Sequence, residues 1–163
     1  MLDIVGPLPV SNGMKYLLTV IDRTSRFVDA LPLPEATAAN CCEAFVSQWV
    51  SRFGLPRTAT TDNGNTFISH LWSQMHDQLG TVVTYTPVYS PASLGSLERQ
   101  HKDIKASLRA VLNHMGDTHG SSWLSALPWV LLGRRCAHQP DLGTSPAELV
   151  FGQTPLIPGA LAG

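Results

Sequence analysis

Three acidic residues stand where carboxylates could act together: Asp3, Asp62 and Glu98. Asp3 lies inside an apolar run, L-D-I-V-G, and Asp62 begins the turn D-N-G directly after a short β-branched run. Glu98 follows near the start of a long helical pattern, separated from Asp62 by 35 residues. A carboxylate within a buried strand is unfavourable unless it is paired, and a divalent cation is a common partner. The three residues therefore suggest metal-assisted chemistry on phosphates.

The chemistry depends on how close the three carboxylates come. Carboxylates a few Å apart cannot all stay ionised without a cation. Two Mg²⁺ ions about 4 Å apart would neutralise them, activate an attacking oxygen and stabilise a leaving 3′ oxygen. Spacing alone is weak evidence, because the chain has 12 acidic residues. Asp3 in an apolar run is stronger evidence, whereas Asp62 before Asn-Gly could equally be a turn former.

Composition limits the class of protein. The 163 residues are 44% hydrophobic and 14% charged, which is enough apolar material for one domain with a core and argues against disorder. The net charge of −1 argues against a strong free-standing nucleic-acid binder. Apolar stretches are too short for a membrane span, so we expect no membrane partner. Cys41, Cys42 and Cys136 form neither a disulfide framework nor a structural zinc motif and read as free thiols.

The elements that must position the acids follow from periodicity and turn signals. Residues 2–5, 15–22 and 26–31 are expected strands joined by short turns, with a hairpin-turn signal at Asn12-Gly13 and the third strand stopped by Pro32 and Pro34. Thr37 caps a helix whose buried stripe is Ala38, Cys42, Phe45, Val46, Trp49 and Phe53. A strand at 58–61, a helix ending at Leu79 and a strand at 81–86 complete the order βββαβαβ. Helices are then expected at 96–115, at 122–134 and from about residue 145, where T-S-P-A-E at 144–148 is a capped helix start.

Seven segments resemble one known family, in order and over nearly the whole chain. They are L-D-I-V-G-P-L-P at 2–9, Y-L-L-T-V-I-D-R at 16–23, F-G-L-P-R-T-A-T-T-D-N-G at 53–64, Y-S-P-A-S-L-G-S-L-E-R-Q-H at 89–101, L-P-W-V-L-L-G-R-R at 127–135, T-S-P-A-E-L-V-F-G at 144–152 and I-P-G at 157–159. The chain resembles the catalytic core of a retroviral-type integrase, closest to the integrases of gypsy-type LTR retrotransposons.

The resemblance implies an RNase H-like α/β fold: a five-stranded mixed sheet, three antiparallel strands then two parallel ones, flanked by helices. It assigns catalysis and metal binding to Asp3, Asp62 and Glu98, with two Mg²⁺ (or Mn²⁺) ions per site. It implies a polynucleotidyl transferase that trims the 3′ ends of retroelement cDNA and joins them to target DNA. The implied partners are those DNAs and further copies, in a homodimer or higher multimer.

The resemblance also sets the expected domain organisation. We expect residues 1–163 to be the catalytic core alone, excised from a longer protein, without the family's amino-terminal zinc domain or carboxy-terminal DNA-binding domain. The loop before Glu98 departs from the family, because S-P-A-S-L-G at 90–95 lacks its usual His and Asn. This departure bears on DNA positioning and not on metal binding. The expected location is nuclear, with a cytoplasmic virus-like-particle stage.

Several residues have a functional and a structural interpretation. Lys102 and Lys105 share a helical face with Glu98 and are candidate DNA contacts, or else an ordinary solvated face. Arg99, Asn63 and Gly95 are further candidates for DNA contact. The four tryptophans are expected in the core or a dimer interface, and Asp22 and Asp29 are expected to pair with Arg23 or Arg26.

Two other functions remain open from the sequence. An inactive or domesticated integrase-like module would bind protein or DNA without catalysis. A nuclease of the same fold would cut without joining.

Overall fold

The computed structural model describes residues 1–61, 70–85, 103, 106–107, 110 and 123–157. Its strands are β1 (Leu2–Val5), β2 (Tyr16–Ile21), β3 (Val28–Leu33), β4 (Thr58–Thr61) and β5 (Val82–Tyr85). Its helices are α1 (Ala38–Ala44), the π-helix η1 (Phe45–Val50), α2 (Ser51–Phe53), α3 (His70–Leu79), α5 (Trp123–Cys136) and α6 (Pro146–Phe151). The predicted order βββαβαβ is confirmed.

The first three strands form an antiparallel meander in the order β1-β2-β3. Asn12 and Gly13 form the tight turn before β2 with positive φ angles of 47° and 80°, the conformation that the Asn-Gly signal predicts. The prediction that Pro32 stops the third strand is wrong, because β3 continues to Leu33 and pairs Pro32 with Leu17. Since β3 is at the edge of this sheet, a proline without an N–H group is tolerated there.

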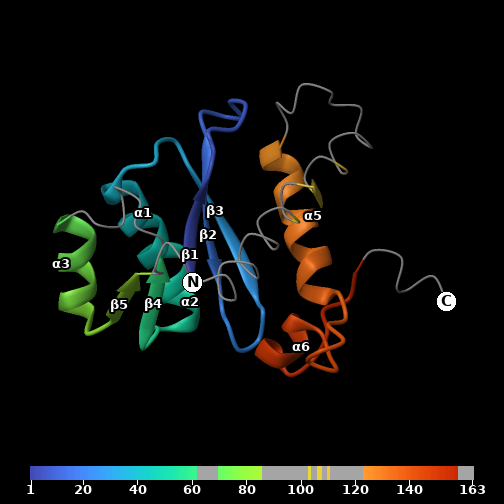
Figure 1. The fold of residues 1–163 in the computed structure, drawn as a ribbon. Coiled ribbons are helices and arrows are strands. Elements are labelled where there is room, and N and C mark those ends of the chain that lie inside the picture. The colour runs from blue at the N-terminus through green and yellow to red at the C-terminus, as the bar shows by residue number, and fades with distance from the viewer. Residues whose placement is uncertain (62–69, 86–102, 104–105, 108–109, 111–122, 158–163) are drawn as a thin grey trace.

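The last two strands, β4 and β5, form a parallel pair in which Thr58 lies opposite Val82 and Thr61 opposite Tyr85. Hydrogen bonds group the described strands into this pair and the meander, and β4 lies beside β1 where the two groups meet (Figure 1). The predicted sequence of three antiparallel strands followed by two parallel ones is therefore confirmed.

The helical segment after β3 begins as predicted, because the Thr37 hydroxyl accepts a hydrogen bond from the Asn40 amide at 3.3 Å. Its middle turns are π-helical, which shifts the side chains relative to an α-helical stripe. The buried residues are consequently Cys41, Ala44, Phe45 and Trp49. The predicted stripe is wrong at Val46, which is exposed, whereas Cys42 and Phe53 are half-buried and pack against the core.

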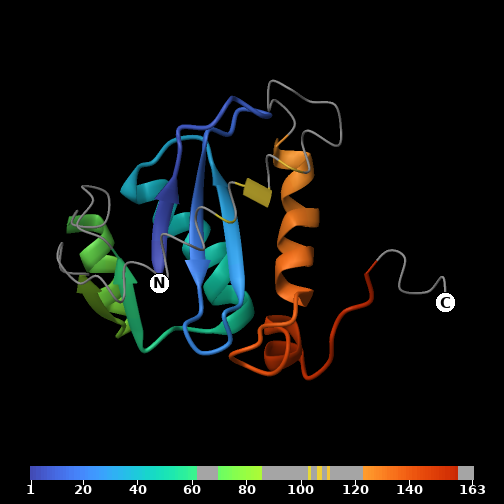
Figure 2. The same cartoon turned by 45° about the vertical axis from the view of Figure 1, so that its right-hand side comes forward.

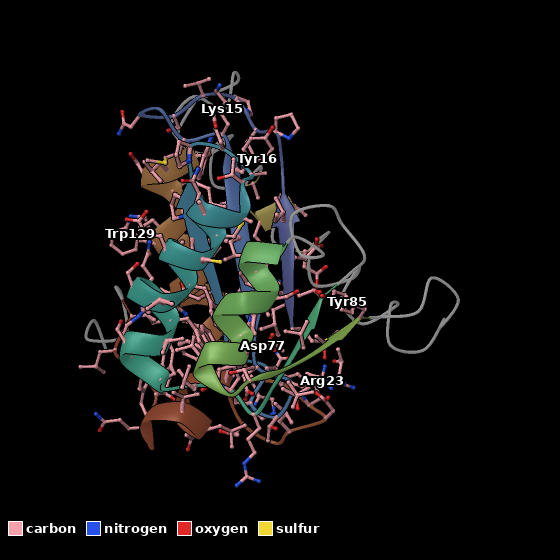
Figure 3. The ribbon with its side chains drawn as sticks, turned by 90° about the vertical axis from the view of Figure 1, so that its left-hand side faces the viewer. Lys15, Tyr16, Arg23, Asp77, Tyr85 and Trp129 are labelled. Carbon is pink, nitrogen blue, oxygen red and sulfur yellow. The ribbon has the colours of Figure 1, made fainter. Side chains whose placement is uncertain are left out.

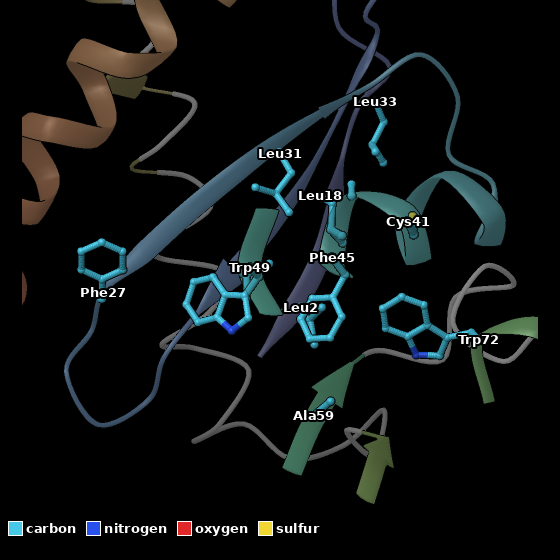
Figure 4. Close-up of a cluster of buried hydrophobic side chains, with 12 residues drawn as sticks. Leu2, Leu18, Phe27, Leu31, Leu33, Cys41, Phe45, Trp49, Ala59 and Trp72 are labelled. Atoms are coloured by element: carbon cyan, nitrogen blue, oxygen red, sulfur yellow. The ribbon is translucent and has the colours of Figure 1, made fainter. Parts of the chain in front are cut away.

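Buried side chains form two clusters, one on each face of the meander. The η1-side cluster contains Leu2, Leu18, Val20, Phe27, Leu31, Leu33, Cys41, Ala44, Phe45, Trp49, Ala59 and Trp72 (Figure 4). The α5-side cluster contains Val5, Leu17, Ile21, Val28, Ala30, Trp123, Ala126, Leu127, Val130 and Leu131. Figure 2 shows α5 against one face of the sheet, with η1 and α2 behind the other.

Helix α5 begins at Trp123, whose indole Nε1 donates a hydrogen bond to the Pro9 carbonyl at 2.6 Å. Trp49, Trp72 and Trp123 are buried, as predicted for core tryptophans, but Trp129 is 58% exposed and points away from the sheet (Figure 3). Helix α6 is capped by Ser145, whose hydroxyl accepts from the Glu148 amide at 3.2 Å. Among the described helices, none has the length and apolar character needed to cross a membrane.

Ion pairs join the meander to the helices on both of its faces. The buried carboxylate of Asp29 on β3 pairs with Arg52 of α2 at 2.5 Å and with Arg135 of α5 at 2.8 Å. Pairing of Asp29 with Arg23 or Arg26 was therefore a wrong prediction, and Arg26 pairs with Asp141 instead. The sequence signal was local, whereas the partners that satisfy a buried carboxylate come from distant helices packed over it.

Candidate active site

Asp3 lies on β1 opposite Thr19 of β2, and its side chain is half-buried. Its Oδ1 atom accepts a hydrogen bond from the Ile4 amide at 2.7 Å. The Thr19 hydroxyl donates to the Asp3 backbone carbonyl at 3.0 Å. These contacts hold both the backbone and the carboxylate of Asp3 in place.

The face on which Asp3 lies follows from the strand pleat. Leu2 and Ile4 pack in or against the η1-side cluster, while Val5 belongs to the α5-side cluster. Since successive side chains point to opposite faces, Asp3 shares the α5-side face with Val5. Helix α5 covers this face over the meander (Figure 2).

On the neighbouring strand β4, Ala59 is buried in the η1-side cluster, so Thr60 points to the same face as Asp3. The Thr60 hydroxyl lies 3.0 Å from the Thr84 hydroxyl of β5. Thr61, the last residue of β4, is buried, and its partner across the ladder, Tyr85, is partly exposed at the same strand ends (Figure 3). The carboxyl ends of β4 and β5 thus form a polar, accessible edge beside β1.

Most of the predicted site lies outside the described residues. These are Asp62 and Glu98 of the proposed triad and all five candidate DNA contacts, Asn63, Gly95, Arg99, Lys102 and Lys105. Asp62 immediately follows Thr61 in the chain. Of the triad, the described residues therefore include Asp3 alone, on β1 next to the strand that leads into Asp62.

Beyond Glu98, four residues of the predicted helix at 96–115 are described, and all four are helical: Asp103, Ala106, Ser107 and Ala110. Asp103 Oδ2 lies 3.6 Å from Arg134 Nη2 of α5. This ion pair connects the segment that follows Glu98 to the helix that covers the sheet.

A carboxylate at this edge fits the chemistry of a hard divalent cation, since Mg²⁺ prefers oxygen ligands and few protein carboxylates. Within the described part of the chain, no group of three or more His, Cys, Asp or Glu side chains could hold a metal ion. Of the three predicted ligands, only Asp3 falls within that part.

Two features of this region were missed in the sequence. The Thr60–Thr84 hydroxyl pair is signalled only by threonines recurring in T-A-T-T and T-V-V-T, which also suit any strand. His76 on α3 is fully buried, with neither ring nitrogen hydrogen-bonded, between Phe45 and Trp72. Burial lowers the pKa of His76 below its usual value, partly offset by Asp77.

Comparison with known proteins decides the family. The Integrase core domain family matches residues 1–91, more than half of the chain. The chain belongs to this family. It is 33% identical over 150 residues to the Gag-Pol polyprotein of gibbon ape leukemia virus and 32% identical over 156 residues to that of koala retrovirus. These alignments cover 91% and 95% of the chain but only 9% of each polyprotein.

Solved structures agree with this assignment. The catalytic core of BIV integrase superposes with a TM-score of 0.67 at 26% identity, covering 91% of this chain and 90% of that one. The catalytic core of HTLV-2 integrase, solved with magnesium in a trimeric form, superposes with a TM-score of 0.72 at 19% identity, covering 90% and 91%. The predicted retroviral-type integrase core and its RNase H-like fold are both confirmed.

Proposed function

We propose that this chain is the catalytic core of a retroelement integrase. It would trim the 3′ ends of retroelement cDNA and join them to target DNA by metal-dependent phosphodiester transfer. The observation that carries the proposal is the position of Asp3, anchored on β1 beside β4, the strand that leads into Asp62. Family membership supports the reaction class, and the exposed Thr84 and Tyr85 make the end of β5 accessible from outside.

Asp3, Asp62 and Glu98 would hold the metal, which we propose to be two Mg²⁺ or Mn²⁺ ions. When bound, such ions activate the attacking oxygen and stabilise the leaving 3′ oxygen. The magnesium in the HTLV-2 integrase core supports this choice for the present chain.

The protein's own part is to hold the first ligand still. The Ile4 amide donates to Asp3 Oδ1, and the Thr19 hydroxyl holds the Asp3 carbonyl. The antiparallel ladder then fixes β1 against β2 over four residue pairs. Ligands fixed on strands of a packed sheet keep their geometry better than ligands on loops.

The proposed DNA contacts are those named from the sequence. Lys102, Lys105 and Arg99 would supply cationic side chains for phosphate oxygens, and Asn63 and Gly95 would supply close backbone or amide contacts. Contacts of this kind set the register of the DNA without reading its sequence.

We further propose that the core works as a homodimer or higher multimer. The trimeric form of the HTLV-2 core supports multimerisation, and the exposed Trp129 on α5 supplies apolar surface outside the core. Sedimentation at high concentration should therefore show species larger than a monomer, and a monomer throughout would contradict the proposal. Action on chromosomal DNA implies a nuclear location that follows a cytoplasmic particle stage.

The first prediction concerns the triad, in a strand-transfer assay with a preprocessed DNA end and Mg²⁺ or Mn²⁺. Asp62→Asn, Glu98→Gln and Asp3→Asn should each lower the rate by at least about 100-fold, because each removes a charge that stabilises the transition state. Asp77→Asn on α3 and Glu35→Gln before α1 are matched controls at exposed positions, and both should retain activity.

The products separate the alternatives. Joined DNA supports the integrase, whereas cleavage without joining supports a nuclease of the same fold. If the full-length protein yields neither product and the three substitutions change nothing, the catalytic proposal is wrong and a binding module takes its place.

A further inference from the structure

A pair of hydroxyl groups lies on the sheet face that carries Asp3. Thr60 of β4 and Thr84 of β5 are direct partners in the parallel ladder, and their Oγ1 atoms lie 3.0 Å apart. Thr84 is exposed and Thr60 is half-buried. The pair is therefore fixed in position by the ladder and accessible from outside.

Its position relative to the proposed site follows from the chain. Ala59 and Thr61 on either side of Thr60 are buried toward the η1-side cluster, so Thr60 points to the opposite face. Thr60 comes two residues before Asp62 in the chain, and Asp62 itself lies outside the described residues. Asp3 occupies the same face as Thr60 on the adjacent strand β1.

Both hydroxyl hydrogens of the pair have internal acceptors, but one of the two hydrogen bonds is long and can be exchanged for a bond to a ligand. Two hydroxyls carry two hydrogens, and one of them is used between the oxygens. The other internal acceptor is the Ala59 carbonyl, 3.5 Å from Thr84 Oγ1, which is the long end of hydrogen-bond geometry. A phosphate oxygen facing the pair would offer a shorter acceptor for the second hydrogen.

We infer that the Thr60–Thr84 hydroxyl pair contacts a phosphate of the DNA strand that is cut and sets its register against the carboxylates. This inference rests on the proposed function. Uncharged donors suit such a role, because hydrogen bonds to phosphate position a duplex. A purely structural role for the pair would predict an effect on strand stability and none on the cleavage position.

The second prediction tests this role with isosteric changes in the full-length protein. Thr60→Val and Thr84→Val remove the hydroxyls and keep the β-branched shape. Each should raise the KM for a DNA end on the order of tenfold, as expected for loss of a hydrogen bond to a charged group. Each should also increase cleavage one nucleotide from the correct position, while Thr60→Ser, which keeps the hydroxyl, should behave as the wild type.

Thr58→Val is the matched control, because Thr58 lies on the same strand and face, two residues further from Asp62, opposite Val82. It should leave KM and cleavage position within about twofold of the wild type, the scatter expected of a surface change. Thermal unfolding of all variants reports any loss of folding separately.

Unchanged KM and cleavage position in Thr60→Val and Thr84→Val would overturn the inference, and so would an equal change in Thr58→Val. If the wild type itself transfers no strand, the proposed function fails. In that case the hydroxyl contact is tested by the affinity of the same DNA end for the four variants and the wild type. Affinities in Thr60→Val and Thr84→Val equal to that of the wild type would overturn the contact.

Discussion

The two groups of strands differ in how they are buried. In the meander of β1, β2 and β3, both faces are covered, by η1 and α2 on one side and by α5 on the other (Figure 2). In the parallel pair, Ala59 and Thr61 are buried on one face, while Thr58, Val82 and Thr84 are exposed on the other. The sheet therefore changes from a two-sided core to a one-sided one.

The change occurs at β1, the strand that carries Asp3. One edge of β1 is fixed by antiparallel pairing to β2, and the other lies beside β4. A ligand placed there is held by the rigid part of the sheet and still reaches the open part. Under the proposed function, this arrangement would separate the residues that give stability from those that contact DNA.

The third prediction compares the two regions directly and has the largest expected effect on stability. Leu18 on β2 is 0% exposed, and Leu18→Ala should lower the free energy of unfolding by about 2–5 kcal/mol through lost burial and a cavity. Val82 on β5 is 61% exposed, and Val82→Ala should lower it by less than about 1 kcal/mol. Urea denaturation followed by fluorescence measures both.

Equal losses of unfolding free energy in Leu18→Ala and Val82→Ala would contradict the proposed difference between the two groups of strands. They would mean that the open face of the parallel pair is buried in solution, for example by a partner copy, and dilution would then change the result at Val82 alone.

The fourth prediction concerns the buried face of the parallel pair, which α3 covers with His76. Burial lowers its pKa, so below about pH 6.5, the usual histidine value, the unfolded chain binds a proton that the folded chain does not. Stability should therefore fall as the pH falls through that value. His76→Phe should remove this dependence and add about 1 kcal/mol at pH 7, since it removes two buried nitrogens without partners.

The exposed His138 provides the control. His138→Gln should keep the wild-type loss of stability between pH 7 and 5, measured by urea denaturation at each pH. A loss in His76→Phe as large as that in His138→Gln would show that other groups cause the pH dependence.

The fifth prediction has the smallest effect and concerns the connection from α5 to the segment after Glu98. Arg134 and Asp103 are partly exposed and 3.6 Å apart, so a double-mutant cycle with alanine should give a coupling of only about 0.2–1 kcal/mol. The coupling should shrink in high salt, because ions screen exposed charges. A coupling of zero at low salt would mean that α5 is not joined to this segment through the pair.

Local signals in the sequence predicted the order and type of most described elements. The Asn12-Gly13 turn, the Thr37 and Ser145 caps and the apolar runs of β1 and β2 all correspond to the structure. Each depends on neighbours within a few residues, which is why sequence alone could predict them. Motif resemblance led to the correct family, although the catalytic and metal-binding roles of Asp3, Asp62 and Glu98 all stay predictions.

The errors arose where distant contacts decide the outcome. The turns of η1 are π-helical, and Val46, which the sequence placed in the buried stripe, is 40% exposed. Asp29 pairs with Arg52 of α2 and Arg135 of α5, which lie more than 20 and more than 100 residues further along the chain. A prediction from sequence spacing treats every helix as an ideal α-helix and pairs each charge with a near neighbour in the chain. It does not include the tertiary packing that determines which residues are buried and which charges pair.

By itself, the sequence determined the order of strands and helices along the chain and where most helices begin. It also identified the three acids that suggest metal chemistry. These features depend on short-range periodicity and residue type. Only the tertiary structure decided that Asp3 lies at the boundary between a covered and an open face, and that Thr60 and Thr84 share that face. The reason is geometric: which side of a strand meets a helix depends on strands and helices far apart in the chain. A pattern of alternating residues shows two faces but not which one is covered.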